Sequence, residues 1–164
     1  MEDVSGDTAP RLREAVRALI VDEDDRVLLV RLTFAGVSFW LNPGGGIEPG
    51  EDRLTALARE LREEVGIHVD ALGPEVWTKT AHFTMGPWDG QVDHVHLVRI
   101  PHVEPLGTFS PEELLAESLD AARWWSREEL AASGDVFAPR EFPRLYAEPL
   151  DGGVPPAPIV LWGY

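Results

Sequence analysis

The chain has 164 residues and carries 29 acidic against 14 basic side chains, a formal net charge of −15 at pH 7. This length suffices for one domain with a sizeable core, and we expect a single domain over residues 1–164. The sequence contains no cysteine, which excludes disulfides and thiolate chemistry, and its negative charge disfavours nucleic acid and anionic membranes as partners.

The N-terminal segment, residues 1–10, is acidic and has no basic region followed by an apolar core. We therefore predict a flexible lead-in and no secretory signal. No apolar run reaches the length of a membrane span, so the sequence predicts a cytoplasmic protein without a membrane partner.

Two strands are predicted over residues 11–22 and 26–33, joined by the acidic turn Asp22-Glu23-Asp24-Asp25. The first is apolar nearly throughout its second half, as expected for a strand that is covered on both faces. Arg13, Arg17 and Arg31 on these strands could contact phosphate, although strand arginines more often face solvent.

Residues 39–43 lead into the glycine turn Gly44-Gly45-Gly46, and we expect Trp40 to pack against that turn rather than to stack on a base. An amphipathic helix follows within residues 51–67. Its apolar stripe, at helical spacing, consists of Leu54, Leu57, Ala58, Leu61 and Val65.

Residues 68–84 and 91–101 are predicted to be largely extended, with a turn over residues 85–90. His94 and His96 share one strand face; a His-x-His pair can bind zinc, but no clear third ligand accompanies it, which favours an ordinary strand pair. Phe83 and Trp88 are either base-stacking residues on the substrate side or ordinary packing.

Residues 102–121 are predicted to be irregular, with Glu117 and Asp120 as candidates for a further metal-binding or water-activating carboxylate. Residues 122–125 resemble a strand, and Ser126 with Glu129 predicts a capped helix. Residues 143–147 suggest a last short helix. In the tail, residues 151–164, the apolar segment 159–162 would dock either on the body or on a second subunit, as in a homodimer.

Three glutamates of the long helix form the candidate site. Glu60, Glu63 and Glu64 lie at i, i+3 and i+4, so their carboxylates share one helix face and repel one another. A hard divalent cation such as Mg²⁺ favours carboxylate oxygens and would reverse that repulsion. The alternative is a solvated acidic helix face.

The glutamates belong to a longer pattern that resembles the Nudix box, G-x5-E-x7-R-E-U-x-E-E-x-G-U, where U is aliphatic. The matching residues are Gly45, Glu51, Arg59, Glu60, Leu61, Glu63, Glu64, Gly66 and Ile67. The resemblance implies the Nudix fold, an α/β/α sandwich with a mixed sheet and the box helix on one side.

The resemblance also implies a function: metal-dependent hydrolysis of a pyrophosphate bond in a nucleoside diphosphate linked to another moiety. Mg²⁺, with Mn²⁺ as an alternative, is the implied cofactor, and a small phosphorylated nucleotide is the implied substrate. The implied metal ligands are Gly45, through its carbonyl, Glu60, Glu63 and Glu64. The implied catalytic residues are Glu51, Arg59, Glu63 and Glu64, with Arg59 positioning Glu51 or a ligand glutamate.

Rival functions remain within the same family. A Nudix-like nucleotide sensor with little catalysis is the alternative of a different class, although the box is intact. An isopentenyl diphosphate isomerase needs a catalytic cysteine, and a messenger-RNA decapping enzyme needs a basic RNA path. At the position where related sequences often carry a glutamate before Arg-Trp, this chain has Ala121.

Overall fold

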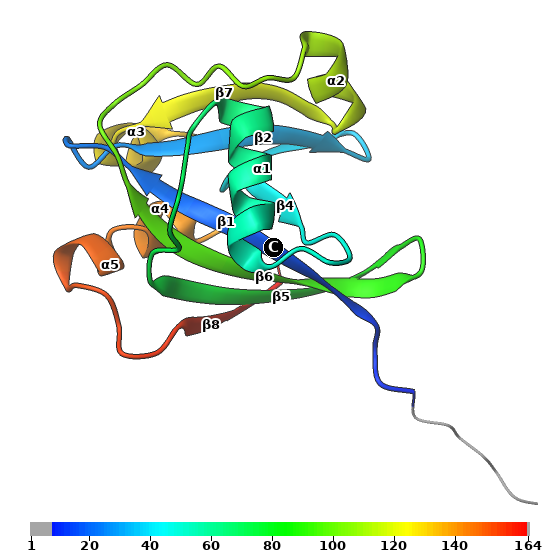
Figure 1. Ribbon diagram of the computed structural model, residues 1–164. Coiled ribbons are helices and arrows are strands. Elements are labelled where there is room, and N and C mark those ends of the chain that lie inside the picture. Colours follow the sequence, from blue (N-terminus) through cyan, green and yellow to red (C-terminus); the bar gives the residue numbers. More distant parts are fainter. Residues whose placement is uncertain (1–7, 164) are drawn as a thin grey trace, which may run out of the picture.

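The structure is a computed structural model that describes residues 8–163. They form a mixed sheet of eight strands with helices on both faces (Figure 1). The strands are β1 (Leu12–Val21), β2 (Val27–Phe34), β3 (Val37–Leu41), β4 (Gly44–Gly46), β5 (Glu75–Met85), β6 (Trp88–Arg99), β7 (Leu119–Trp125) and β8 (Ile159–Trp162). The helices are α1 (Arg53–Val65), α2 (Pro111–Ala116), α3 (Arg127–Ala132), α4 (Phe142–Leu145) and α5 (Glu148–Asp151).

The strand order is β3-β2-β1-β6-β5-β8, with β4 paired to β1 and β7 paired to β2. The pairs β1–β6 and β5–β8 are parallel, and the other pairs are antiparallel. The β1–β6 ladder runs from Leu12 opposite Gly90 to Val21 opposite Arg99. Because β1 is central and covered on both faces, its second half is apolar, as predicted.

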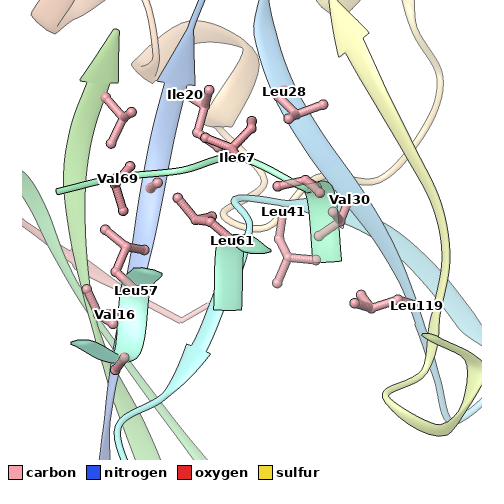
Figure 2. Packing of buried hydrophobic residues seen from close by; sticks show 14 of the residues in the cluster. Val16, Ile20, Leu28, Val30, Leu41, Leu57, Leu61, Ile67, Val69 and Leu119 are labelled. Carbon is pink, nitrogen blue, oxygen red and sulfur yellow. The ribbon is translucent and has the colours of Figure 1, made fainter. Parts of the chain in front are cut away.

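Alternate residues of β1 point into two separate cores. Ala18 and Ile20 belong to the core under α1, and Leu19 and Val21 belong to the core on the opposite face. In the first core the helical stripe of α1 packs on aliphatic residues of the sheet (Figure 2). Its labelled members are Val16, Ile20, Leu28, Val30, Leu41, Leu57, Leu61, Ile67, Val69 and Leu119.

The second core is rich in aromatic residues. It lies under α3 and α4 and is built on Trp77, Trp125, Phe137, Phe142 and Tyr146. Most of the neighbouring rings meet edge to face or stacked, at centroid distances of 5.2–6.3 Å. The first core fixes α1 against one face of the sheet, and the second packs α3 and α4 on the other. This arrangement confirms the predicted α/β sandwich.

Most predicted elements are present, with shifted ends. The two N-terminal strands, the long helix and the helix capped by Ser126 and Glu129 are confirmed. The predicted glycine turn is itself a short strand, β4, paired with β1. The predicted turn over residues 85–90 was too long, because β5 and β6 extend into it and leave only Gly86 and Pro87 between them. The segment 102–121 was wrongly taken as irregular throughout, since it contains α2 and the start of β7.

The C-terminal segment docks on the body. β8 pairs in parallel with β5, and this satisfies one of the two predicted alternatives; the second subunit stays a prediction. Much of the lead-in predicted over residues 1–10 lies outside the described residues. Within residues 8–163 no helix has the length and apolar character needed to cross a membrane. The single-domain organisation and the cytoplasmic location stay predictions.

Candidate active site

Helix α1 is fixed at both ends by residues that the chain supplies locally. Asp52 is its N-cap and accepts a hydrogen bond from the Thr55 amide at 2.8 Å. Gly66 ends it in the left-handed conformation, with φ 70°, as predicted. A side chain at Gly66 would collide with the carbonyl of Leu106, so the end of α1 also touches the segment after β6.

Arg59 is the centre of an acidic cluster on α1. Its Nε and Nη2 donate to the two carboxylate oxygens of Glu51, each at 2.9 Å. Its Nη1 donates to Oε1 of Glu60 at 2.9 Å and lies 3.5 Å from the nearest oxygen of Glu63. Nη2 also reaches the carbonyl of Gly46 at 3.2 Å. One guanidinium therefore joins the helix, the preceding loop and the glycine strand.

The glycine strand passes directly beside two of the glutamates. The Gly44 amide donates to Oε2 of Glu64 at 3.3 Å. A Cβ built on Gly45 would lie 2.7 Å from Oε1 of Glu60, so only glycine allows this close approach. The backbone of β4 and the carboxylates of Glu60 and Glu64 thus share one small volume.

The environment changes the pKa of these acids in opposite directions. The hydrogen bonds from Arg59 lower the pKa of Glu51 to about 2. Burial raises the pKa of Glu64 well above its ordinary value, and the neighbouring charge of Glu60 raises it further. Burial also raises the pKa of Glu63, against the charge of Arg59. Glu51 is therefore held as a carboxylate, whereas the charge of Arg17 only partly offsets the raised pKa of Glu64.

The donor set fits a hard divalent cation. Three glutamates face one side of α1 with one arginine among them, and Gly45 leaves room beside Glu60 where a side chain would stand. Within residues 8–163 no group of three or more His, Asp or Glu side chains is arranged so that it could hold a metal ion by itself. Mg²⁺ does not require such a group, because it is usually held by one or two carboxylates, waters and substrate phosphates.

A second charged cluster lies behind the glycine strand. Nε of Arg17 donates to Asp93 at 3.0 Å, and its Nη1 donates to the carbonyls of Asn42 at 3.0 Å and Gly44 at 3.4 Å. Nζ of Lys79 lies 3.6 Å from the second oxygen of Asp93. These side chains are nearly buried, and they hold the strand that faces Glu64.

In this second cluster two cations face the one carboxylate of Asp93, and burial lowers the pKa of Lys79. Burial acts to raise the pKa of Asp93, but the charges of Arg17 and Lys79 outweigh it and keep the pKa below its ordinary value. Burial also acts to lower the pKa of Arg17, yet the carboxylates of Asp93 and Glu64 leave it above its ordinary value. Opposite charges thus compensate one another here.

The other residues that were predicted to bind phosphate or metal differ in their surroundings. Asp120 accepts from Arg31 at 2.7 Å and from Thr33 at 3.2 Å, which ties both charged residues into a pair between β2 and β7. Glu117 follows α2, and its charge contributes to the raised pKa of Glu63. Arg13 lies against Gly46 and forms no ion pair with any residue in the described range 8–163.

The histidines and aromatic residues have structural partners. His94 lies between Glu75 at 2.5 Å and Glu14 at 2.6 Å, while His96 is buried with Nδ1 2.7 Å from the Gly73 carbonyl. Trp40 is buried in the second core and donates to Asp135 at 3.0 Å. Trp88 packs under the guanidinium of Arg11, 5.5 Å from the ring centroid. Trp40 therefore packs rather than facing a base, but its partners are the aromatic core and Asp135 instead of the predicted glycine turn.

Sequence reasoning missed two parts of this region. Asp93 and Lys79 were not singled out, because Asp93 meets Arg17 from a strand far away in the chain and Lys79 lies opposite Asp93 only through the register of β5 and β6. The anchoring of the segment after β6 was also missed: the amides of Thr108 and Phe109 donate to the carbonyls of Arg62 and Glu63, each at 3.1 Å. Only the glycine at position 107, which permits the close approach, gave a signal.

Comparisons with known proteins agree with this geometry. The family model described as the NUDIX domain matches residues 11–146. Nudix hydrolase 25 of Arabidopsis thaliana is 32% identical over 135 residues, which cover 73% of this chain and 75% of the plant protein. Phosphatase NudJ of Escherichia coli (strain K12) is 28% identical over 123 residues, which cover 74% of each chain.

Solved structures show the same fold. The crystal structure of the MutT protein from Methanosarcina mazei Go1 matches with a TM-score of 0.65 at 21% identity, covering 88% of this chain and 99% of that one. The family match over most of the chain, the shared fold and the complete box on α1 lead to one conclusion. The chain belongs to the Nudix hydrolase family, and it is a pyrophosphohydrolase.

Proposed function

We propose that the protein hydrolyses a pyrophosphate bond in a small nucleoside diphosphate linked to another moiety, with Mg²⁺ or Mn²⁺ as cofactor. The observation that carries this proposal is the excess of carboxylates around Arg59 at helix α1, next to the glycine strand β4. A diphosphate is polyanionic, so this acidic face can meet it only through a cation.

We assign different roles to the residues of the box. Arg59 holds Glu51 with two hydrogen bonds and fixes the orientation of Glu60, so we assign both Arg59 and Glu51 positioning roles. Glu60, Glu63, Glu64 and the carbonyl of Gly45 would hold the metal, which supplies charge neutralisation and a more acidic bound water when present. Glu63 or Glu64 would serve as the general base, since burial raises the pKa of each toward the working range.

Arg13 is the proposed phosphate contact from the protein. Its guanidinium lies against Gly46 at the end of the glycine strand, whereas Arg17 and Arg31 are engaged with Asp93 and Asp120. A free guanidinium next to a metal site can bind a phosphate oxygen bidentately. Replacing Arg13 should therefore raise KM more than it lowers kcat.

Small substrates are favoured over nucleic acid and membranes. The chain has a net charge of −15, and its arginines near the site are few and mostly paired. Long nucleic acid needs a continuous basic path, which this charge balance opposes. The cytoplasmic location is part of the same proposal.

The test is a substrate panel with and without divalent cation. ADP-ribose, nucleoside diphosphate sugars, 8-oxo-dGTP, ordinary dNTPs and diadenosine polyphosphates are incubated with the protein and Mg²⁺, Mn²⁺ or EDTA. We expect cation-dependent release of a nucleoside monophosphate from at least one of them. Tight nucleotide binding without turnover of any compound would instead support the sensor alternative.

A further inference from the structure

A pocket next to Glu64 lies outside the box and has a different chemistry. It has a volume of about 430 Å³, within the range of roughly 300–1,000 Å³ that small-molecule sites show. Its floor is the β2–β7 ladder, where Val30 pairs with Ala122. Its wall is the segment from Pro105 to Leu115, and Glu64 also lines it.

The wall is fixed to the catalytic helix. The amides of Thr108 and Phe109 donate to carbonyls in the last turn of α1, and a side chain at Gly107 would come within 2.6 Å of the backbone of Glu64. The pocket therefore keeps a fixed position relative to Glu63 and Glu64. A group that fills it lies beside Glu64.

The lining is largely apolar. The described lining residues include no lysine or arginine, and the charged ones are Glu64 and Asp120. Asp120 is already neutralised by Arg31 at 2.7 Å. A phosphate or carboxylate placed here would face only acids, and a sugar would leave many hydroxyls without partners. An uncharged apolar group would suffer neither the charge repulsion nor the loss of hydrogen bonds.

We propose that this pocket binds an uncharged, largely apolar group carried on the diphosphate of the substrate. The inference rests on the proposed function, because it takes the diphosphate to lie at Glu60, Glu63 and Glu64. The pocket then adds binding energy for a hydrocarbon chain or a flat aromatic ring, and selects against substrates whose second group is charged. Two leucines at its rim, Leu106 and Leu115, are 81% and 64% exposed and would be covered by that group.

Binding is measured by calorimetry in Mg²⁺ with probes that cannot be hydrolysed. The probes are methylenediphosphonate, its geranyl monoester and its naphthylmethyl monoester. We expect at least one ester to bind about tenfold or more tightly than methylenediphosphonate, from the added apolar contact. A preference for the geranyl ester identifies a hydrocarbon chain as the occupant, and a preference for the naphthylmethyl ester identifies a ring.

Variants at the rim connect this preference to the pocket. In Leu106→Asn and Leu115→Asn the advantage of the ester should fall to about twofold, and both leucines are exposed enough that the fold is kept. Leu72→Asn is the matched control, because Leu72 is 37% exposed and lies outside the pocket. The inference is overturned if no ester binds more tightly than methylenediphosphonate, or if the advantage survives in both rim variants.

The same measurements separate this inference from the proposed function. Cation-dependent turnover of a nucleotide in the panel, together with no ester preference, would leave the function standing and remove the pocket assignment. An ester preference that the rim variants abolish, together with no turnover of any compound, would support the pocket assignment and remove the function.

Discussion

Two charged clusters flank the glycine strand β4, and they differ in how their charges are compensated. On the side of α1, the carboxylates of Glu51, Glu60 and Glu63 surround one guanidinium, with Glu64 beside them. On the side of β1 and β6, Arg17 and Lys79 enclose the single carboxylate of Asp93.

This difference distinguishes the candidate reactive site from the cluster that supports it. The cluster around Arg59 keeps uncompensated negative charge, which adds to the effect of burial in raising the pKa of Glu64 and can be relieved by a cation. The cluster around Asp93 is balanced in the sense that its one carboxylate is compensated by two cations. In this molecule, unbalanced charge marks the candidate site, and balanced buried charge marks the part that holds the site in place.

Removing one carboxylate from the unbalanced cluster should have the largest effect. Glu63→Gln and Glu64→Gln keep side-chain size but weaken cation binding and remove the candidate base. We expect each to lower kcat by about 10³-fold on the best substrate at saturating Mg²⁺, measured by steady-state kinetics. Without metal, each variant should be at least as stable as the parent, because repulsion falls.

The matched control is Asp52→Asn on the same helix. Asn also serves as an N-cap, so neither stability nor turnover should change much. Near-parental turnover in both glutamate variants would show that the acidic face is only solvated. Equal losses in the control would point to damage of the helix instead.

Breaking the balanced cluster should reduce stability first. Arg17→Met leaves Asp93 buried with a more distant partner and removes the donor to the carbonyls of Asn42 and Gly44. We expect the free energy of unfolding to fall by about 3 kcal/mol in urea titrations. Arg31→Met, which breaks the more exposed pair with Asp120, should cost less than about 1 kcal/mol. Similar losses in the two variants would refute the contrast.

Divalent cation should stabilise the unbalanced cluster and leave the other unchanged. At ten times its dissociation constant, a ligand specific to the folded state adds about 1.4 kcal/mol, or about 4 °C in Tm for a protein of this size. We expect such a rise with Mg²⁺ by calorimetry in the parent and in Arg31→Met. The rise should shrink in Glu64→Gln, and an unchanged rise there would place the cation elsewhere.

Lowering the pH should reduce the free energy of unfolding through the balanced cluster, by less than the changes predicted above. The pKa of Asp93 in the folded protein lies below the ordinary 3.8, so the unfolded chain binds more protons as pH falls. This contribution to stability is complete above pH 3.8 and is lost as pH falls through the lowered pKa. In Asp93→Asn the acid limb of stability against pH should be flatter. An acid limb as steep as that of the parent would contradict the assignment.

The sequence predicted the candidate site well because its residues are local. Glu60, Glu63 and Glu64 share a helix face by spacing alone, and the pairing of Arg59 with Glu51 joins residues that are eight apart. Gly66 could be predicted as the end of the helix because the left-handed conformation favours glycine. Short-range sequence patterns were therefore sufficient to predict the arrangement of the box residues.

Long-range contacts could not be predicted from one sequence. Arg17 and Asp93 are brought together by the parallel pairing of β1 and β6, which no local pattern specifies. Helix α2 was missed although Ser110 and Glu113 form a capping box, because the short acidic segment lacks an apolar stripe. Trp40 was expected against the glycine turn but packs in the aromatic core, because that core gathers residues from strands and helices far apart in the chain.

The hydrogen bonds from Thr108 and Phe109 to the last turn of α1 have a kinetic consequence. These two amides belong to an irregular segment, where exchange with solvent deuterons is normally fast. Here they can exchange only when the segment detaches from the carbonyls of Arg62 and Glu63. Because Glu63 belongs to that turn, one opening event loosens the segment and the glutamates together, and the exchange rate of these amides reports how often the site comes apart.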